Sequence, residues 1–205
     1  GVPSYKEMGW QSGFFVNSDM ADEYGIDLST VKTLEDYTEV LQTVKEKSTA
    51  AGENVIGVSG MSFNLTTPYE SLTGTPTLPG ASPVSAFGNF EGEDEVFNQY
   101  ASQDYMDYCN LVRGWYNNGY LSADPVNYDS DTANRDNDFA NGKLFSYVIS
   151  YAPGAAEAEE AKTGHGVTFV PLMDPLFETR NAMGGLLAIS SASEYPEKAL
   201  EFINL

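Results

Sequence analysis

The stretch from residue 144 to residue 170 decides the fold class of this chain. It begins with Leu144-Phe-Ser-Tyr-Val-Ile-Ser150, a short apolar run that predicts a buried strand. Ala155-Ala-Glu-Ala-Glu-Glu-Ala-Lys162 follows, and its strong helix formers predict a helix. Gly166-Val-Thr-Phe-Val170 then predicts another strand. A strand, a helix and a strand in succession are typical of a sheet that is flanked by helices.

The same alternation extends in both directions. Further strands are predicted at residues 13–17, 55–59 and 185–190, and helices at 18–24, 34–51, 102–118, 130–141 and 196–205. Thr33 and Asp36 form a capping-box pattern before the second helix, and the helix at 102–118 has a broad apolar face that includes Met106, Trp115 and Tyr116. Residues 61–100, rich in Gly, Pro, Ser and Thr, predict a long irregular stretch. We therefore predict an α/β fold with a mixed β-sheet flanked by helices.

Composition excludes one class of partner. Thirty acidic residues against ten basic ones give a formal net charge of −20. A field of that sign repels phosphate backbones and anionic membrane surfaces, so nucleic acid is not an expected partner. The simplest role of so acidic a surface is solubility.

Residues that could carry catalysis or hold a metal are few. The single cysteine, Cys109, allows no disulfide within the chain, and the single histidine, His165, lies between two glycines in a predicted turn. The segment from Asp129 begins like a calcium loop, but Ala133 and Ala140 stand where oxygen ligands are needed. We expect no catalytic residue, no metal and no cofactor, although thirty acidic residues leave room for an unmarked carboxylate pair of the glycosidase type.

The ends of the sequence indicate a longer protein. No apolar run of about 18 residues and no signal peptide are present, yet the chain starts at Gly1 without an initiator methionine. The final residues, from Pro196 to Leu205, predict a helix without a stop signal. We expect the chain to be part of something longer.

Several segments, taken in order, resemble the maltose-binding-like extracellular solute-binding proteins (family 1), and more narrowly the oligosaccharide-binding lipoproteins of Gram-positive bacteria. The matching segments cover essentially the whole chain: Val2-Pro-Ser-Tyr5, 13–20, 24–27, 31–36, Phe63-Asn-Leu-Thr-Thr-Pro-Tyr69, 115–124, Phe139-Ala-Asn-Gly-Lys143, Ala152-Pro-Gly154, 188–190, 195–199 and 202–204. Each motif alone has low specificity, and the resemblance depends on their order and spacing.

This resemblance implies a type II periplasmic-binding-protein-like fold in which residues 1–205 form a single domain, the second (C-terminal) lobe, with the first lobe absent. Two such lobes close on a hinge over a small solute, expected here to be a carbohydrate or oligosaccharide. The implied partner is the membrane permease of an ABC importer. The implied location is extracellular, as a Gram-positive cell-surface lipoprotein or in a periplasm, with membrane contact only through a lipid anchor outside this chain.

The resemblance also implies ligand contacts, transferred by position. They are Trp10, Gln11, Thr67, Tyr69, Tyr151 and Pro153. Aromatic rings pack against the C–H faces of sugars, and amides and hydroxyls bond to their hydroxyl groups. For each residue, ordinary packing is the alternative. Thr67 stands where the family often has a carboxylate, which leaves the sugar class open.

Two other classes of protein remain as alternatives. A carbohydrate-active enzyme predicts two carboxylates that converge in a pocket about 5 to 10 Å apart. A cell-surface adhesion module predicts an exposed, flat aromatic strip and no cleft.

Overall fold

The computed structural model describes residues 2–3, 9–61, 69, 72, 86–88, 95–177 and 186–203. Of the predicted site residues, Thr67 lies outside these ranges, and Trp10 is described by its backbone alone. The chain divides into two compact units, one of residues 11–174 and one of residues 1–10 with 175–205. The expectation that residues 1–205 form a single lobe stays a prediction.

The larger unit is built on a mixed sheet. Its strands, in spatial order, are β3 (Ile56–Ser59), β6 (Leu144–Tyr151), β2 (Gly9–Asn17) and β7 (Val167–Pro171). β3 runs parallel to β6, whereas β2 runs antiparallel to both β6 and β7. The sheet confirms the predicted α/β class, and β2 begins before the predicted start at residue 13.

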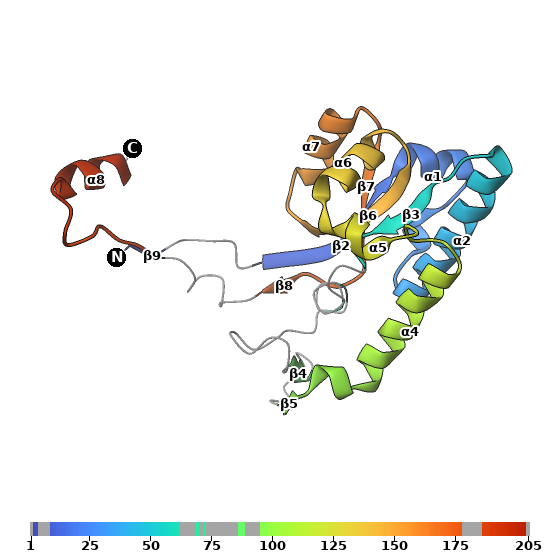
Figure 1. Ribbon diagram of the computed structural model, residues 1–205, viewed down its shortest axis with the longest axis horizontal. Coiled ribbons are helices and arrows are strands. Elements are labelled where there is room, and N and C mark those ends of the chain that lie inside the picture. Colours follow the sequence, from blue (N-terminus) through green and yellow to red (C-terminus); the bar gives the residue numbers. More distant parts are fainter. Residues whose placement is uncertain are drawn as a thin grey trace. The chain divides into compact units, whose positions relative to one another are not determined.

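Helices cover both faces of this sheet. On one side lie α1 (Ser18–Tyr24), α2 (Leu34–Ala51) and α4 (Gln103–Asn117), and on the other lie α6 (Thr132–Ala140) and α7 (Ala155–Thr163) (Figure 1). A short helix, α5 (Pro125–Ser130), contacts β3. Short 3-10 turns occupy Leu28–Thr30 and, as η2, Gln99–Ala101 before α4.

The side chains of β2 explain why both faces are covered. Successive residues of a strand point to opposite sides. Phe14 and Val16 therefore join the core under α2 and α4, while Phe15 joins the second core under α6 and α7. Phe14 stacks on Tyr37 of α2, with ring centroids 4.2 Å apart. Apolar residues in succession thus indicate a strand that is buried on both sides.

The predicted helix starts and stops are largely confirmed. Thr33 and Asp36 form the predicted capping box of α2, and Gly25, at φ +71°, ends α1. The predicted helix at 130–141 is wrong in extent, because Asp131 adopts an extended backbone and separates α5 from α6. Its side chain accepts a hydrogen bond from the Ala133 amide, so this aspartate caps α6.

The predicted apolar face of α4 needs correction. Trp115 is buried as expected, with Tyr108 and Val112 beside it at helical spacing. Met106 and Tyr116 are instead 51% and 48% exposed. Residues three and four apart share a helix face, whereas Tyr116 directly follows Trp115 and is turned by about 100° from it.

The stretch at 61–100, predicted to be irregular, contains a short antiparallel hairpin of β4 (Ala86–Gly88) and β5 (Glu95–Phe97). In the smaller unit, β1 (Val2–Pro3) pairs with β9 (Leu186–Leu187), and β8 (Leu176–Phe177) pairs with Gly9 and Trp10 of β2. Helix α8 (Pro196–Ile203) completes it.

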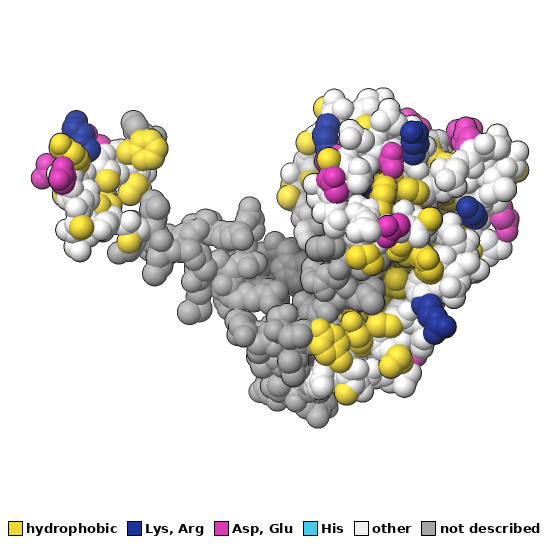
Figure 2. Space-filling view, in the orientation of Figure 1, with side chains coloured by type: hydrophobic (Ala, Val, Ile, Leu, Met, Phe, Trp, Pro, Cys, Tyr) yellow, Lys and Arg dark blue, Asp and Glu magenta, His cyan; other side chains and the backbone are white. Residues whose placement is uncertain are grey.

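Charged side chains are dispersed over the helices of the larger unit on the face in Figure 2, rather than gathered in one patch. Within the described ranges, no helix is both long and apolar enough to cross a membrane.

Candidate functional site

One end of the sheet brings together residues that are far apart in the sequence. β2 starts there and β6 ends there, so Gln11 lies opposite Tyr151 in the strand register. β7 ends at the same place, since Pro171 lies opposite Gly13. We call this the Gln11 end of the sheet. It unites the predicted residues Gln11, Tyr151 and, two positions after Tyr151, Pro153.

Gln11 is half-buried and oriented by the backbone. Its side-chain Nε2 donates a hydrogen bond of 2.9 Å to the carbonyl oxygen of Met173. Beside it, the hydroxyls of Ser12 and Ser150 lie 3.1 Å apart, and Ser12 is buried whereas Ser150 is exposed. Polar side chains of both strands therefore lie side by side where β2 begins and β6 ends.

Two other aromatic rings pack against Tyr151. It stacks on Phe169 of β7, with centroids 4.3 Å apart and an interplanar angle of 18°, and meets Phe15 edge to face. This packing fixes the plane of a half-buried ring at the strand end. Pro153 is exposed in the turn that follows, where Gly154 takes φ +82° before α7 begins.

An aspartate of α5 accepts hydrogen bonds from the end of β3. Asp129 Oδ1 accepts hydrogen bonds from the Ser59 hydroxyl at 2.8 Å and from the Gly60 amide at 2.9 Å. Gly60 has φ +89°, and a Cβ atom there would lie 3.3 Å from the Cβ of Val148. Asp129 thereby holds the backbone at the end of β3.

Tyr69 is packed in the core of the larger unit. Its side chain is 4% exposed, and its ring lies edge to face against Tyr105 and Tyr108, at centroid distances of 5.1 and 5.4 Å. The packing alternative for this residue is thus realised in the structure, and its contact with a ligand stays a prediction.

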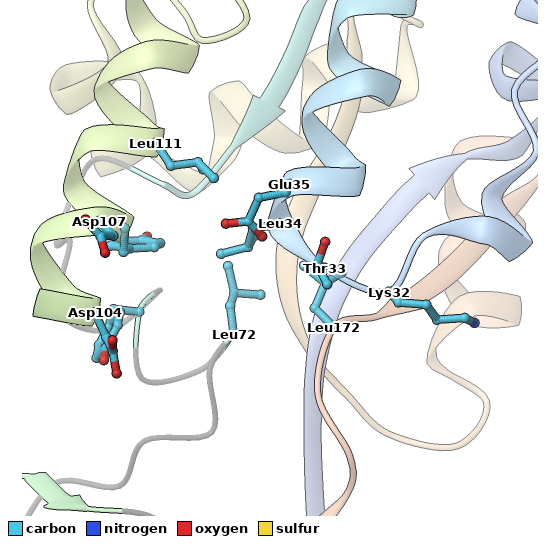
Figure 3. Close-up of a pocket in the computed structure, with 11 residues that line it drawn as sticks. Lys32, Thr33, Leu34, Glu35, Leu72, Asp104, Asp107, Leu111 and Leu172 are labelled. Carbon is cyan, nitrogen blue, oxygen red and sulfur yellow. The ribbon is translucent and has the colours of Figure 1, made fainter.

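A pocket of about 510 Å³ opens beside Tyr69, between the starts of α2 and α4 (Figure 3). We call it the α2–α4 pocket. Its apolar wall consists of four leucines and two buried rings: Leu34, Leu72, Leu111, Leu172, Tyr69 and Tyr108. Leu172 directly follows the last residue of β7, so the pocket lies at the Gln11 end of the sheet.

The polar side chains of this pocket are mostly acidic. Figure 3 shows Asp104 and Asp107 on α4 and Glu35 extending from the start of α2, while Lys32 points away from the cavity. All three carboxylate side chains are exposed. Tyr108 is 5% exposed, and its hydroxyl has no hydrogen-bond partner among the residues the structure describes. Burial raises the pKa of this hydroxyl, so it is a neutral donor at physiological pH.

The family of the chain follows from comparison with known proteins. The family described as bacterial extracellular solute-binding protein matches residues 2–205, which is nearly the entire sequence. This chain belongs to that family. No curated protein sequence matches it.

Solved structures agree with this solute-binding family in fold. The N-glycan transport solute binding protein of Streptococcus pneumoniae matches with a TM-score of 0.73 at 21% identity, over 98% of this chain and 42% of that one. A sugar transporter of Bacillus licheniformis, in complex with stachyose, matches with a TM-score of 0.57 at 14% identity, over 96% of this chain and 49% of that one. The fold is therefore type II periplasmic-binding-protein-like, and the chain spans less than half of these proteins.

No group of three or more metal-ligating side chains occurs within the described part of this solute-binding chain. His165 forms a hydrogen bond within the fold: its Nε2 lies 2.8 Å from the Phe139 carbonyl oxygen. It lies in a bend between α7 and β7, next to Gly164 with φ +81°.

Some site residues escaped the sequence analysis. Ser12, Ser150 and the carboxylates of the α2–α4 pocket were not singled out, and Asp129 was considered only as the start of a calcium-loop-like segment. Ser12 precedes the predicted strand at 13–17 and Ser150 is the last residue of the run that starts at Leu144, so no strand pattern marked either serine as a site residue. Asp104 and Asp107 offered no indication either, since acidic residues on a helix face are ordinarily solvated.

Proposed function

We propose that this chain is one lobe of the substrate-binding component of an ABC importer, and that it binds a carbohydrate at the Gln11 end of its sheet. The observation that carries the proposal is the register of β2 and β6, which sets Gln11 opposite Tyr151. An amide and an aromatic ring on adjacent strands supply the two kinds of contact that sugar rings require.

Each group has a physical role in this proposal. The Gln11 amide nitrogen is held by the Met173 carbonyl, so its side-chain oxygen keeps acceptor capacity for a sugar hydroxyl. Tyr151 is held by Phe169 in one plane, which lowers the entropy lost when a sugar packs against it. Trp10, Thr67, Tyr69 and Pro153 complete the proposed contact set.

The structural neighbours support the ligand class. The S. pneumoniae protein has been crystallised with Man1GlcNAc and with Man5GlcNAc, and the B. licheniformis transporter with stachyose. The present chain covers less than half of each protein. We therefore propose that a second lobe supplies the other side of the site and that closure of the two lobes retains the sugar.

The importer permease, extracellular location and lipid anchor outside residues 1–205 belong to the same proposal. The supporting observation is membership of the bacterial extracellular solute-binding family. Loss of labelled-oligosaccharide uptake on deletion of the gene would test the importer role, and metabolic labelling with palmitate would test the anchor.

A thermal-shift screen of mono- and oligosaccharides on the two-lobe protein tests sugar binding directly. A ligand that binds only the folded state raises the melting temperature. We expect Gln11→Ala and Tyr151→Ala to remove most of the shift. Tyr116→Ala, which alters an exposed ring on α4, is the matched control and should leave the shift intact.

The same screen separates binding from catalysis. A binding protein releases its sugar unchanged, whereas the enzymatic alternative requires new reducing ends to appear during incubation. Hydrolysis of a glycoside, or a shift that survives both site variants, would overturn the proposal.

A further inference from the structure

Two residues next to Gln11 and Tyr151 lie on the opposite face of the sheet. Successive residues of a strand point to opposite sides, so Ser12 shares a face with Phe14, which belongs to the core under α2 and α4. Ser150 lies opposite Ser12 in the strand register and shares that face. Tyr151 packs instead against the core under α6 and α7. The Gln11 end of the sheet therefore presents polar groups on both faces.

Burial decides which of the two serine hydroxyls donates to the other. They lie 3.1 Å apart, and neither has another hydrogen-bond partner among the residues that the structure describes. Ser12 is fully buried, so its proton would be left unsatisfied, away from water, if it pointed anywhere but at Ser150. Ser150 is exposed, so water or a ligand can accept its proton. Ser12 is therefore the donor and Ser150 the acceptor.

The direction of this hydrogen bond determines what Ser150 can offer to a bound molecule. A serine hydroxyl carries one proton and two lone pairs. Because Ser12 occupies one lone pair, Ser150 keeps its proton for an acceptor on the ligand. The Gln11 side chain is complementary, since its Nε2 donates to the Met173 carbonyl and its oxygen is left as an acceptor. Sugar hydroxyls meet both demands, because each of them donates and accepts.

The Ser150 face also offers apolar surface at the same end of the sheet. Leu172 lies beside Ser12, since its amide donates to the Ser12 carbonyl oxygen at 3.5 Å. Its side chain packs against the core under α2 and α4 and lines the α2–α4 pocket. Neighbouring strands are about 4.8 Å apart, so Leu172 and Ser150 are about 10 Å apart across β2. A molecule that contacts both of them and also Tyr151 has to be longer than one sugar ring.

We infer that Ser150 is a further ligand-binding residue, which donates a hydrogen bond to an oligosaccharide of two or more units, and that Ser12 is a positioning residue that holds the Ser150 hydroxyl. The inference rests on the proposed function for the choice of a sugar, and it adds a donor and a minimum length. One sugar unit packs on the Tyr151 ring and bonds to the Gln11 oxygen. The next unit passes over the strand ends, accepts from Ser150 and packs against Leu172.

Isothermal titration calorimetry of the two-lobe protein tests the length of the ligand. The probes are the disaccharides maltose, cellobiose, mannobiose, melibiose and N,N′-diacetylchitobiose, each beside its own monosaccharides: D-glucose, D-mannose, D-galactose and N-acetyl-D-glucosamine. We expect at least one disaccharide to bind more tightly than the monosaccharides from which it is built, because only the disaccharide reaches both faces of the sheet end.

Variants test the two serines with that disaccharide. Ser150→Ala should weaken binding about two- to tenfold, the effect of one hydrogen bond between neutral groups, whereas Ser150→Thr keeps a hydroxyl and should bind nearly as well as the parent. Ser12→Ala leaves the Ser150 hydroxyl in place but unheld, so binding should weaken less.

The double variant separates positioning from a merely structural role. Because Ser12 acts through Ser150, Ser12→Ala should cause no further loss of affinity in the Ser150→Ala background. The double variant also leaves no buried serine hydroxyl unsatisfied, so its melting temperature should stay close to that of the parent. The control, Thr49→Ala, removes an exposed hydroxyl near the end of α2 and should leave the affinity unchanged.

The outcomes separate this inference from the proposed function. A disaccharide that Gln11→Ala binds more weakly, but that Ser150→Ala binds as well as the parent, would overturn the inference and leave the proposed function intact. Equal affinities for every disaccharide and its monosaccharides, or additive losses from Ser12→Ala and Ser150→Ala, would do the same. Absence of binding by every sugar to the folded two-lobe protein would overturn the proposed function and this inference with it.

Discussion

Asp129 and Gly60 are 69 residues apart in the sequence, yet the Gly60 amide donates a hydrogen bond of 2.9 Å to Asp129 Oδ1. The same oxygen accepts from the Ser59 hydroxyl at 2.8 Å. A half-buried carboxylate of α5 therefore fixes the end of β3, where the chain turns away from the sheet. Because this turn lies at the Gln11 end, its stability bears on the candidate site.

Asp129→Ala should lower the free energy of unfolding by about 1–3 kcal/mol, since it leaves two donors without their acceptor. Asp129→Asn keeps an oxygen at the same position and should cost less. Urea unfolding of the three proteins measures both effects. Equal losses for the two variants would show that the hydrogen bonds to Ser59 and Gly60 are not responsible.

Gly60→Ala should destabilise the chain more than Gly25→Ala. Both glycines have positive φ, and an L-residue in that region costs about 1–2 kcal/mol. Gly60 adds a steric cost, because its new Cβ would lie 3.3 Å from Val148 Cβ, whereas a Cβ at Gly25 meets nothing within 4 Å. The difference between the two unfolding free energies isolates the contact with Val148.

Thr38→Val should cost about 1–3 kcal/mol of unfolding free energy, because it leaves a buried indole N–H without its acceptor. Trp115 Nε1 donates to Thr38 Oγ1 at 2.8 Å, and Trp115 is buried between α2 and α4. Thr43→Val is the control on the same helix, since the Thr43 hydroxyl bonds only to the Glu39 carbonyl in the described structure. Comparable losses at the two threonines would contradict this reasoning.

The capping box of α2 should make stability depend on pH. Hydrogen bonds from the Lys32 amide, and from the side chain and amide of Thr33, hold the pKa of the Asp36 carboxyl below its usual value. A group whose pKa is lower in the folded state stabilises the protein above its unfolded pKa, of about 3.9, and loses that effect as the pH falls through the folded pKa.

Asp36→Asn should therefore lower the melting temperature at pH 7, and its difference from the parent protein should shrink progressively below about pH 4. Thermal unfolding at several pH values measures this. Glu35→Gln, one residue earlier on the exposed face, serves as the control for general charge effects. A difference that is constant down to pH 2 would show that the Asp36 charge has no role.

Elements that depend on nearby residues could be predicted from the sequence. Runs of apolar residues predicted β2, β3, β6 and β7 because a strand buried on both faces needs apolar side chains in succession. Thr33 with Asp36 and the glycine at Gly25 predicted helix ends because caps bond to groups only a few residues away. The break at Asp131 was missed, since an aspartate is compatible with both a helix and a cap.

The site itself was decided by the tertiary structure. Gln11 and Tyr151 were predicted separately through a family resemblance, but only the register of β2 and β6 sets them opposite each other. Likewise, only the packing of α2 beside α4 creates the pocket that Asp104, Asp107 and Tyr108 line. Periodicity assigns a residue to a face, whereas strand order and helix packing decide what that face meets. Such contacts join residues that are 70 positions apart, as Leu34 and Asp104 are, or 140 apart, as Gln11 and Tyr151 are, and no local pattern carries information over that distance.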